Sequence, residues 1–204
     1  MMLNCLITGV GGQGTVLMSR LIGAAAIERG FEVRGSETIG MAQRGGSVVS
    51  HLRIGKGIHS PLIPPGKADV IIAFENTEAV RVLPFLSPYG KMMVLDWSIL
   101  PVSAHLKGKP YEPKTMLKYL EGNLGGEEGW EKSSERLTVI DRAVLLERCG
   151  NGKALNVALL GAAVERKFFP FDARDIEQAI RSRLPPKFVE MNLKALAVGR
   201  EIVR

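Results

Sequence analysis

Residues 3–14 read Leu-Asn-Cys-Leu-Ile-Thr-Gly-Val-Gly-Gly-Gln-Gly, and a helix-forming stretch follows from Thr15 to Arg29. The apolar run predicts a buried strand, and the apolar residues at three- and four-residue steps after it predict a helix. A strand, a glycine turn and a helix in this order open many nucleotide-binding α/β domains. We therefore expect a Rossmann-like α/β fold: an open, mostly parallel sheet with helices on both faces and a C-terminal helical segment.

The glycine turn is the first candidate binding site. Gly9, Gly11 and Gly14 fit the pattern G-x-G-x-x-G, with Gly12 and Gln13 between them. In such turns the first glycine permits a tight bend, the second lets the backbone approach a phosphate, and the third lets helix pack against strand. The helix N-terminus then offers free N–H groups to an anion. The competing interpretation is that these glycines only permit close packing.

Binding of a dinucleotide at this turn would require more than the glycines. An acidic residue about 20 positions on, after the second strand, usually binds the ribose. The second strand is expected at residues 31–35, and Glu37 is the only candidate after it. Residues 36–46 are expected to form a long glycine-rich loop, so Glu37 is a weak ribose ligand.

The remaining sequence continues the alternation of strands and helices. Strands are expected at residues 47–54, 58–63 (short), 68–74, 91–97 and 137–140, and the prolines and glycine at 64–66 are expected to break the chain. Helices are expected at residues 75–86, 114–121, 141–148, 153–167 (strongly amphipathic), 172–183 and 187–203. Residues 122–134 contain four glycines and several charges, which predicts a flexible, exposed insertion. We expect a single domain over residues 1–204 that carries this insertion.

Composition limits the possible functions. The chain has 204 residues, 46% hydrophobic and 24% charged, with 27 Lys and Arg against 21 Asp and Glu. The basic residues are scattered and never form a run of five, so we expect no nucleic-acid partner. No stretch approaches the roughly 20 apolar residues of a membrane span, and no signal peptide is visible. We expect a cytoplasmic protein without a membrane partner.

The metal-binding residue types are few. Cys5 and Cys149 are the only cysteines, a number that suits a reducing compartment. An iron–sulfur cluster needs about four thiolates, so this chain cannot ligate one alone. The three histidines, His51, His59 and His105, are not at the spacing of metal ligands. We expect no metal and no catalytic residue that the sequence can identify.

Four segments together carry a family resemblance. They are Gly9-Val-Gly-Gly-Gln-Gly14, Met41-Ala-Gln-Arg-Gly-Gly46, Ser60-Pro-Leu-Ile63 and Ala68-Asp-Val-Ile-Ile-Ala-Phe-Glu75, and residues 156–161 add a fifth. In order and spacing they resemble the gamma-type domain of 2-oxoacid:ferredoxin oxidoreductases. Within that family the chain is most similar to the beta-subunit type of the indolepyruvate ferredoxin oxidoreductases. The resemblance spans nearly the whole chain.

The resemblance implies a subunit that does not work alone. The family oxidatively decarboxylates 2-oxoacids, transfers the acyl group to coenzyme A and passes electrons to ferredoxin. Thiamine diphosphate and [4Fe-4S] clusters carry this chemistry on other chains or domains. The expected partner is therefore a catalytic subunit with thiamine diphosphate and iron–sulfur clusters. The two subunits would form a hetero-oligomer that binds a 2-oxoacid and coenzyme A and passes electrons to ferredoxin. This chain would bind no cofactor alone and would complete the shared site.

Two further groups join the candidate site. The first is the loop with Met41, Gln43, Arg44, Gly45 and Gly46, where the Arg44 guanidinium can bind a phosphate or carboxylate with two hydrogen bonds. Arg44 could instead form an ion pair with a partner subunit, or lie on the plain surface.

The second group is Glu75 and Asn76, at the carboxyl end of an expected strand, where open α/β sheets bind ligands. Glu75 could equally well only cap the next helix. On its own helix, Asn156 is more typical of a core or capping group than of a ligand. Two other functions stay open: a free-standing Rossmann oxidoreductase and a nucleotide-binding module without enzymatic activity.

Overall fold

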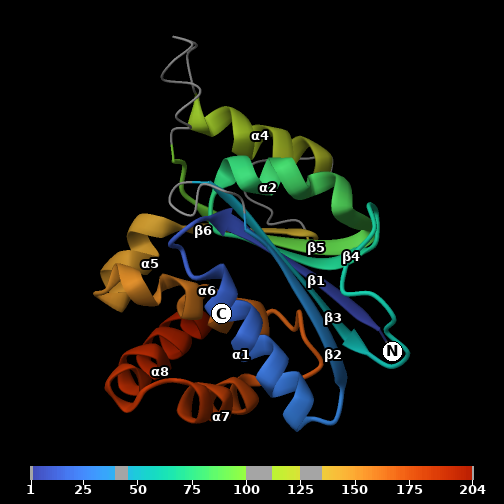
Figure 1. Cartoon of the computed structure of the whole chain (residues 1–204). Helices are drawn as coiled ribbons and strands as arrows, with labels where there is room; N and C mark the ends of the chain where they lie inside the picture. Colours follow the sequence, from blue (N-terminus) through green and yellow to red (C-terminus); the bar gives the residue numbers. More distant parts are fainter. Residues whose placement is uncertain (1, 40–45, 100–111, 125–134, 204) are drawn as a thin grey trace.

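The computed structural model describes residues 2–39, 46–99, 112–124 and 135–203 (Figure 1). The strands are β1 (Leu3–Val10), β2 (Glu32–Ile39), β3 (Ser47–Gly55), β4 (Ala68–Ala73), β5 (Leu86–Asp96) and β6 (Leu137–Asp141). The α-helices are α1 (Thr15–Glu28), α2 (Asn76–Val82), α4 (Pro113–Leu124), α5 (Arg142–Cys149), α6 (Leu155–Glu165), α7 (Ala173–Arg183) and α8 (Pro186–Glu201). Short 3₁₀ turns precede β5 and α6, at Leu83–Phe85 and Gly152–Ala154.

The strands form one six-stranded sheet in the order β2-β3-β1-β4-β5-β6. The pairs β1–β4, β4–β5 and β5–β6 are parallel, whereas β3 runs antiparallel to both β1 and β2. The expected α/β class with a mostly parallel sheet is confirmed. The antiparallel β3, inserted between β1 and β2, departs from the pattern that the first strand, turn and helix suggest.

Helices cover both faces of the sheet, as expected. Figure 1 shows α2 and α4 on one face and α1, α6, α7 and α8 on the other. Successive residues of a strand point to opposite faces, so Cys5 and Ile7 belong to the larger core under α1 and α6, while Leu6 belongs to the smaller one. The central strands β1 and β4 are therefore apolar on both faces along most of their length, as in sheets buried on both sides.

Helix α6 differs from its expected amphipathic character, because Leu155 to Val164 are all buried. The reason is its very close contact with α8. A side chain at Gly161 would run into the backbone of Leu196, and one at Gly199 would run into the backbone of Ala158. A helix that is apolar all round is one enclosed by its neighbours.

Several expected boundaries are wrong. Residues 36–39 extend β2 rather than opening the loop, because they continue its ladder with β3 down to the pair Ile39–Val48. Residues 58–63 form no strand, since the Ile63 N–H donates to His51 Nδ1 (3.1 Å) instead of to a ladder. The helix expected at residues 75–86, with its end near 88–90, is shorter: α2 ends at Val82, and residues 88–90 lie within β5, opposite a register irregularity of β4.

The expected insertion at residues 122–134 begins later than predicted. Gly122, Asn123 and Leu124 form the end of α4, and Leu124 is buried against the smaller core. Residues 125–134 lie outside the described residues. Among the described helices, none is long and apolar enough to cross a membrane.

We expect a pH effect from His51. Its ring is buried, and burial lowers its pKa below the usual value of about 6.5. As pH falls, His51 therefore becomes protonated in the unfolded chain before it does so in the folded protein. The stability that His51 contributes should be present above about pH 6.5 and lost as pH falls through its folded-state pKa.

Urea unfolding between pH 5 and 8 tests this expectation. The variant His51→Asn keeps an acceptor for the Ile63 N–H but cannot titrate, so it should show a smaller loss of stability toward pH 5. Equal slopes for both proteins would contradict a buried neutral His51.

Candidate functional site

The candidate site lies where β1 and β4 end side by side. These two strands are parallel neighbours, and the chain leaves β1 toward α1 on one face and β4 toward α2 on the other. In open α/β sheets, ligands bind outside the carboxyl ends of strands at such a switch point. The glycine turn and residues Glu75–Asn76 both lie at this edge, so the structure brings two of the expected groups together.

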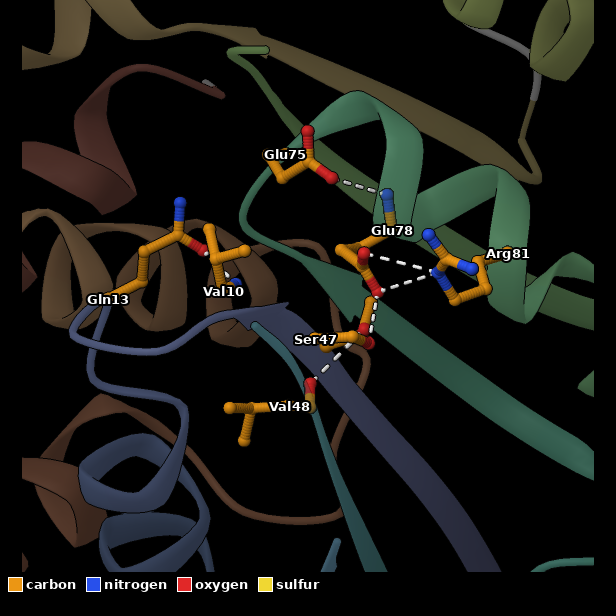
Figure 2. A network of polar contacts seen from close by, with 8 residues as sticks. Val10, Gln13, Ser47, Val48, Glu75, Glu78 and Arg81 are labelled. Atoms are coloured by element: carbon orange, nitrogen blue, oxygen red, sulfur yellow. Dashed lines mark hydrogen bonds and ion pairs between the residues drawn. The ribbon is translucent and has the colours of Figure 1, made fainter. Parts of the chain in front are cut away.

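Gln13 fixes the shape of the glycine turn. Its Oε1 accepts a hydrogen bond from the Val10 N–H at 2.7 Å (Figure 2). A side chain at Gly9 would collide with this oxygen and with Cβ of Phe74, 3.0 Å away, so close packing does account for Gly9. Because Oε1 must face the N–H, the amide nitrogen faces away. Gln13 Nε2 is buried without a hydrogen-bond partner among the described residues, and it is available to a ligand that accepts a hydrogen bond.

Gly11 and Gly12 open the turn toward solvent. Gly12 has a φ of 99°, which favours glycine, and a side chain there would meet no atom within 4 Å. Gly11 donates its N–H to the carbonyl of Gly46 at 2.9 Å. The end of the second candidate loop therefore lies against the glycine turn. Four candidates from that loop, Met41, Gln43, Arg44 and Gly45, lie outside the described residues.

A polar network connects the first residue of β3 to α2. Ser47 donates its hydroxyl to the Glu78 carboxylate, which also accepts from Arg81 Nε at 3.1 Å (Figure 2). Glu78 is buried and donates its backbone N–H to Glu75 Oε1. Sequence reasoning missed Ser47 and Glu78. Two features of the sequence could have identified them. Ser47 directly follows the glycine pair Gly45-Gly46, and Glu78 is at the third helical position after Glu75, where a side chain helps to cap a helix.

Glu75 is the N-cap residue of α2, as the simpler of its two interpretations predicts. Its carboxyl group is buried, and burial raises its pKa above the usual range, while the nearby N–H groups of Glu78, Thr77 and Ile99 partly oppose this shift. Asn76 is also buried and donates to Asp96 (2.9 Å) and Ser98 (3.1 Å). Its Oδ1 has no hydrogen-bond partner among the described residues, so it can accept from a ligand.

Gly14 is in contact with a residue from the far end of the chain. Gly14 has a φ of 86° and is the N-cap of α1. Asn156 of α6 is buried and donates its Nδ2 to the Gly14 carbonyl at 3.3 Å. A side chain at Gly14 would collide with the Asn156 amide. Asn156 is thus a buried polar group that contacts the turn, consistent with its interpretation as core or capping residue.

The N-terminus of α1 has no side-chain cap. The side chains of Glu75, Asp141 and Asp172 cap α2, α5 and α7, whereas Gly14 has no side chain to cap α1 and its first turn carries no acid. The first N–H groups of a helix have no partner within the helix, and the helix dipole makes that end positive. Together with Gln13 Nε2, this end suits binding of a phosphate or another anionic acceptor.

Glu37 is poorly placed as a ribose ligand. It lies in β2 and pairs with Ser50 of β3, so a whole strand separates it from β1 and the glycine turn. There it lines a cavity of about 750 Å³ between α1 and β2, beside Arg20 and Arg183. The usual pair of a glycine turn and an acid on the adjacent strand is therefore absent from the described residues.

The described residues offer no place for a metal cofactor. They contain no group of three His, Cys, Asp or Glu side chains that could hold a metal ion. Cys5 is fully buried in β1, where burial raises the pKa of its thiol, and Cys149 is on α5. A four-thiolate iron–sulfur cluster does not fit a chain with two cysteines. The arrangement at the β1–β4 edge can bind and orient a ligand.

Comparison with known proteins points to one family. The model of the family "Pyruvate ferredoxin/flavodoxin oxidoreductase" matches residues 4–202. Indolepyruvate oxidoreductase subunit IorB of Thermococcus kodakarensis is 35% identical over 197 residues, which cover 96% of this chain and 93% of that protein.

Two solved structures have similar folds. Pyruvate oxidoreductase subunit PORC of Thermotoga maritima has a TM-score of 0.68 at 22% identity, covering 100% of this chain and 97% of that chain. The 2-oxoglutarate:ferredoxin oxidoreductase of Magnetococcus marinus, solved with 2-oxoglutarate, coenzyme A and succinyl-CoA bound, has a TM-score of 0.67 at 17% identity. It covers 99% of this chain and 31% of that chain.

Proposed function

We propose a specific role from the premise that this chain belongs to the pyruvate ferredoxin/flavodoxin oxidoreductase family and is a subunit of a 2-oxoacid:ferredoxin oxidoreductase. The chain is the gamma-type subunit of a complex that oxidatively decarboxylates indolepyruvate or a similar arylpyruvate. The products are an acyl-coenzyme A and electrons for ferredoxin. The observation that carries this proposal is the near full-length similarity to a subunit of indolepyruvate oxidoreductase.

The electron-transfer cofactors belong to a partner subunit in this proposal. Two cysteines cannot hold a [4Fe-4S] cluster, and the described residues hold no metal site for the diphosphate of thiamine. A catalytic subunit with thiamine diphosphate and iron–sulfur clusters must therefore supply decarboxylation and electron transfer. This chain completes the site that it shares with that subunit.

Coenzyme A is the ligand that we assign to the edge where β1 and β4 end. It carries phosphates and amide groups, and the edge offers the N-terminus of α1, which no side chain caps, together with Gln13 Nε2 and Asn76 Oδ1, two buried atoms without a hydrogen-bond partner among the described residues. The candidate ligand-binding residues remain Gly9, Gly11, Gly12, Gln13, Gly14, Met41, Gln43, Arg44, Gly45, Gly46, Glu75 and Asn76. The enzyme from Magnetococcus marinus, of which 31% of the chain matches this fold, was solved with coenzyme A bound.

A dinucleotide-dependent enzyme is the competing function, and the topology disfavours it. β3 separates β2 from β1, so Glu37 does not lie beside the glycine turn, where a ribose ligand is expected. Titration of the pure chain with NADH, followed by fluorescence, separates the two functions. Tight binding of NADH by the isolated chain would favour the dinucleotide enzyme.

Copurification tests the subunit role directly. The tagged chain is expressed in its native host and isolated under anaerobic conditions. We expect a larger protein with iron and thiamine diphosphate to copurify, and arylpyruvate-dependent reduction of ferredoxin to require both chains. A chain that purifies alone, with no activity restored by the host's iron–sulfur fractions, would refute the role.

A charge at Gly12 tests the coenzyme A site. In the assembled complex, Gly12→Asp should raise the KM for coenzyme A about tenfold or more, because a carboxylate at the open turn repels phosphate. Gly57→Asp is the matched control. Gly57 also has a positive φ (69°) and free space around it, but it follows β3 at the opposite end of the sheet. Equal KM values for the two variants would place coenzyme A elsewhere.

A further inference from the structure

We propose that Asn156 is a positioning residue for ligand binding: it holds Gly14 so that the N-terminus of α1 faces the coenzyme A site. The inference rests on the proposed function only for the identity of the ligand. It concerns a residue of α6 that contacts the turn from 142 positions away in the sequence.

Two hydrogen bonds hold the Asn156 amide in a single orientation toward Gly14. Nδ2 of Asn156 donates to the Gly14 carbonyl (3.3 Å), while its Oδ1 accepts from the Val157 N–H (2.9 Å). These two bonds fix the orientation of the amide, because an N–H group must face the Oδ1 atom. The same Gly14 carbonyl accepts from the Met18 N–H (3.1 Å), which is the first hydrogen bond of α1. Asn156 therefore holds the carbonyl from which α1 begins.

Gly14 needs this support because it is in a left-handed conformation and has no side chain of its own to cap α1. Glycine reaches such a φ easily but also leaves it easily, since it has the widest range of backbone conformations. A change at Gly14 would turn the first N–H groups of α1 away from the ligand. The Asn156 amide packs where a side chain of residue 14 would lie, so it restricts the glycine from outside.

Asn156 can serve as a fixed point because α6 is itself immobilised. The backbone of α6 touches that of α8 at two places, Gly161 against Leu196 and Ala158 against Gly199. Asn156 is in the first turn of α6 and is 4% exposed. The turn on β1 is thus tied to the most closely packed pair of helices among the described elements.

The test compares Asn156→Ala with Asn192→Ala. Asn192 is equally buried (3% exposed) and also donates its amide to a backbone carbonyl, that of Phe188 at 2.8 Å, but it lies on α8. The Asn156 variant should speed hydrogen exchange of peptides covering residues 11–18 about fivefold or more. In the assembled complex it should raise the KM for coenzyme A about fivefold to tenfold, with kcat nearly unchanged. The Asn192 variant should change neither quantity, although it loses similar stability.

Two outcomes would overturn the inference. The first is unchanged exchange at residues 11–18 in Asn156→Ala. The second is faster exchange with an unchanged KM for coenzyme A while Gly12→Asp still raises it, because the turn would then bind the ligand without help from Asn156. If Gly12→Asp has no effect, the assignment of coenzyme A fails, and the exchange data alone decide whether Asn156 holds the turn. Asn156→Ser, a milder change, replaces Asn156→Ala if that variant does not fold.

Discussion

Gly199→Ala should lower the free energy of unfolding by about 3 kcal/mol, the upper end of what overpacking a core usually costs. The Cβ of an alanine at this position would overlap the carbonyl of Ala158, which is backbone and cannot rotate away. Helices α6 and α8 would have to separate, and the buried apolar side chains between them would lose contacts. Because α6 carries Asn156, the glycine turn should loosen as well.

Gly122→Ala is the control for this prediction. Gly122 is near the end of α4, and a side chain there would meet no atom within 4 Å. Alanine should therefore stabilise the chain by about 0.5–1 kcal/mol, because it restricts the unfolded chain and favours the helix. Urea unfolding of both variants measures the difference. A Gly199→Ala protein as stable as the wild type would show that α6 and α8 are not locked at this point.

The sequence predicts most strands and helices because a buried parallel strand and its covering helix have strong local signals. The run at residues 70–74 is apolar throughout, and Asp172 forms the capping box that begins α7. Strand order has no such local signal. The antiparallel β3 between β1 and β2 follows from the pairing of residues 32–39 with residues 48–55, and the expected glycine-rich loop at residues 36–46 gave no signal for this pairing. The burial of α6 has the same origin, since it depends on the distant Gly199.

The residues of the candidate site also differ in whether the sequence around them predicts their role. The glycine turn, Gln13 and Asn76 can be found from spacing, because they lie next to strand ends whose positions the sequence predicts. Glu75 has two possible roles, and only the bond from Glu78 N–H distinguishes capping from ligand binding. Ser47 and Asn156 act through partners 31 and 142 positions away, and single-sequence patterns do not encode such pairings.

Arg44→Ala should raise the KM for coenzyme A of the assembled complex about 10-fold to 100-fold, with folding and assembly intact. A hydrogen bond to a charged group contributes about 1.5–3 kcal/mol, and every 1.4 kcal/mol is a factor of ten in affinity. Arg44 is outside the described residues, but Gly46, two positions later, is held beside the turn by its bond from Gly11, and Ser47 is bonded to Glu78 of α2. The Arg44 guanidinium is therefore only two residues in sequence from Gly46, which is held at the glycine turn.

The second variant, Arg44→Lys, separates charge from geometry. Lysine keeps the positive charge but cannot form the two parallel hydrogen bonds of arginine, so it should recover only part of the loss. Arg34→Ala on β2 removes a positive charge at an exposed position and controls for a general electrostatic effect. Steady-state kinetics with coenzyme A varied at saturating 2-oxoacid gives the KM values. If Arg44→Ala assembles with an unchanged KM, Arg44 does not bind the ligand; if both Arg44 variants fail to assemble, Arg44 belongs to the interface between the subunits.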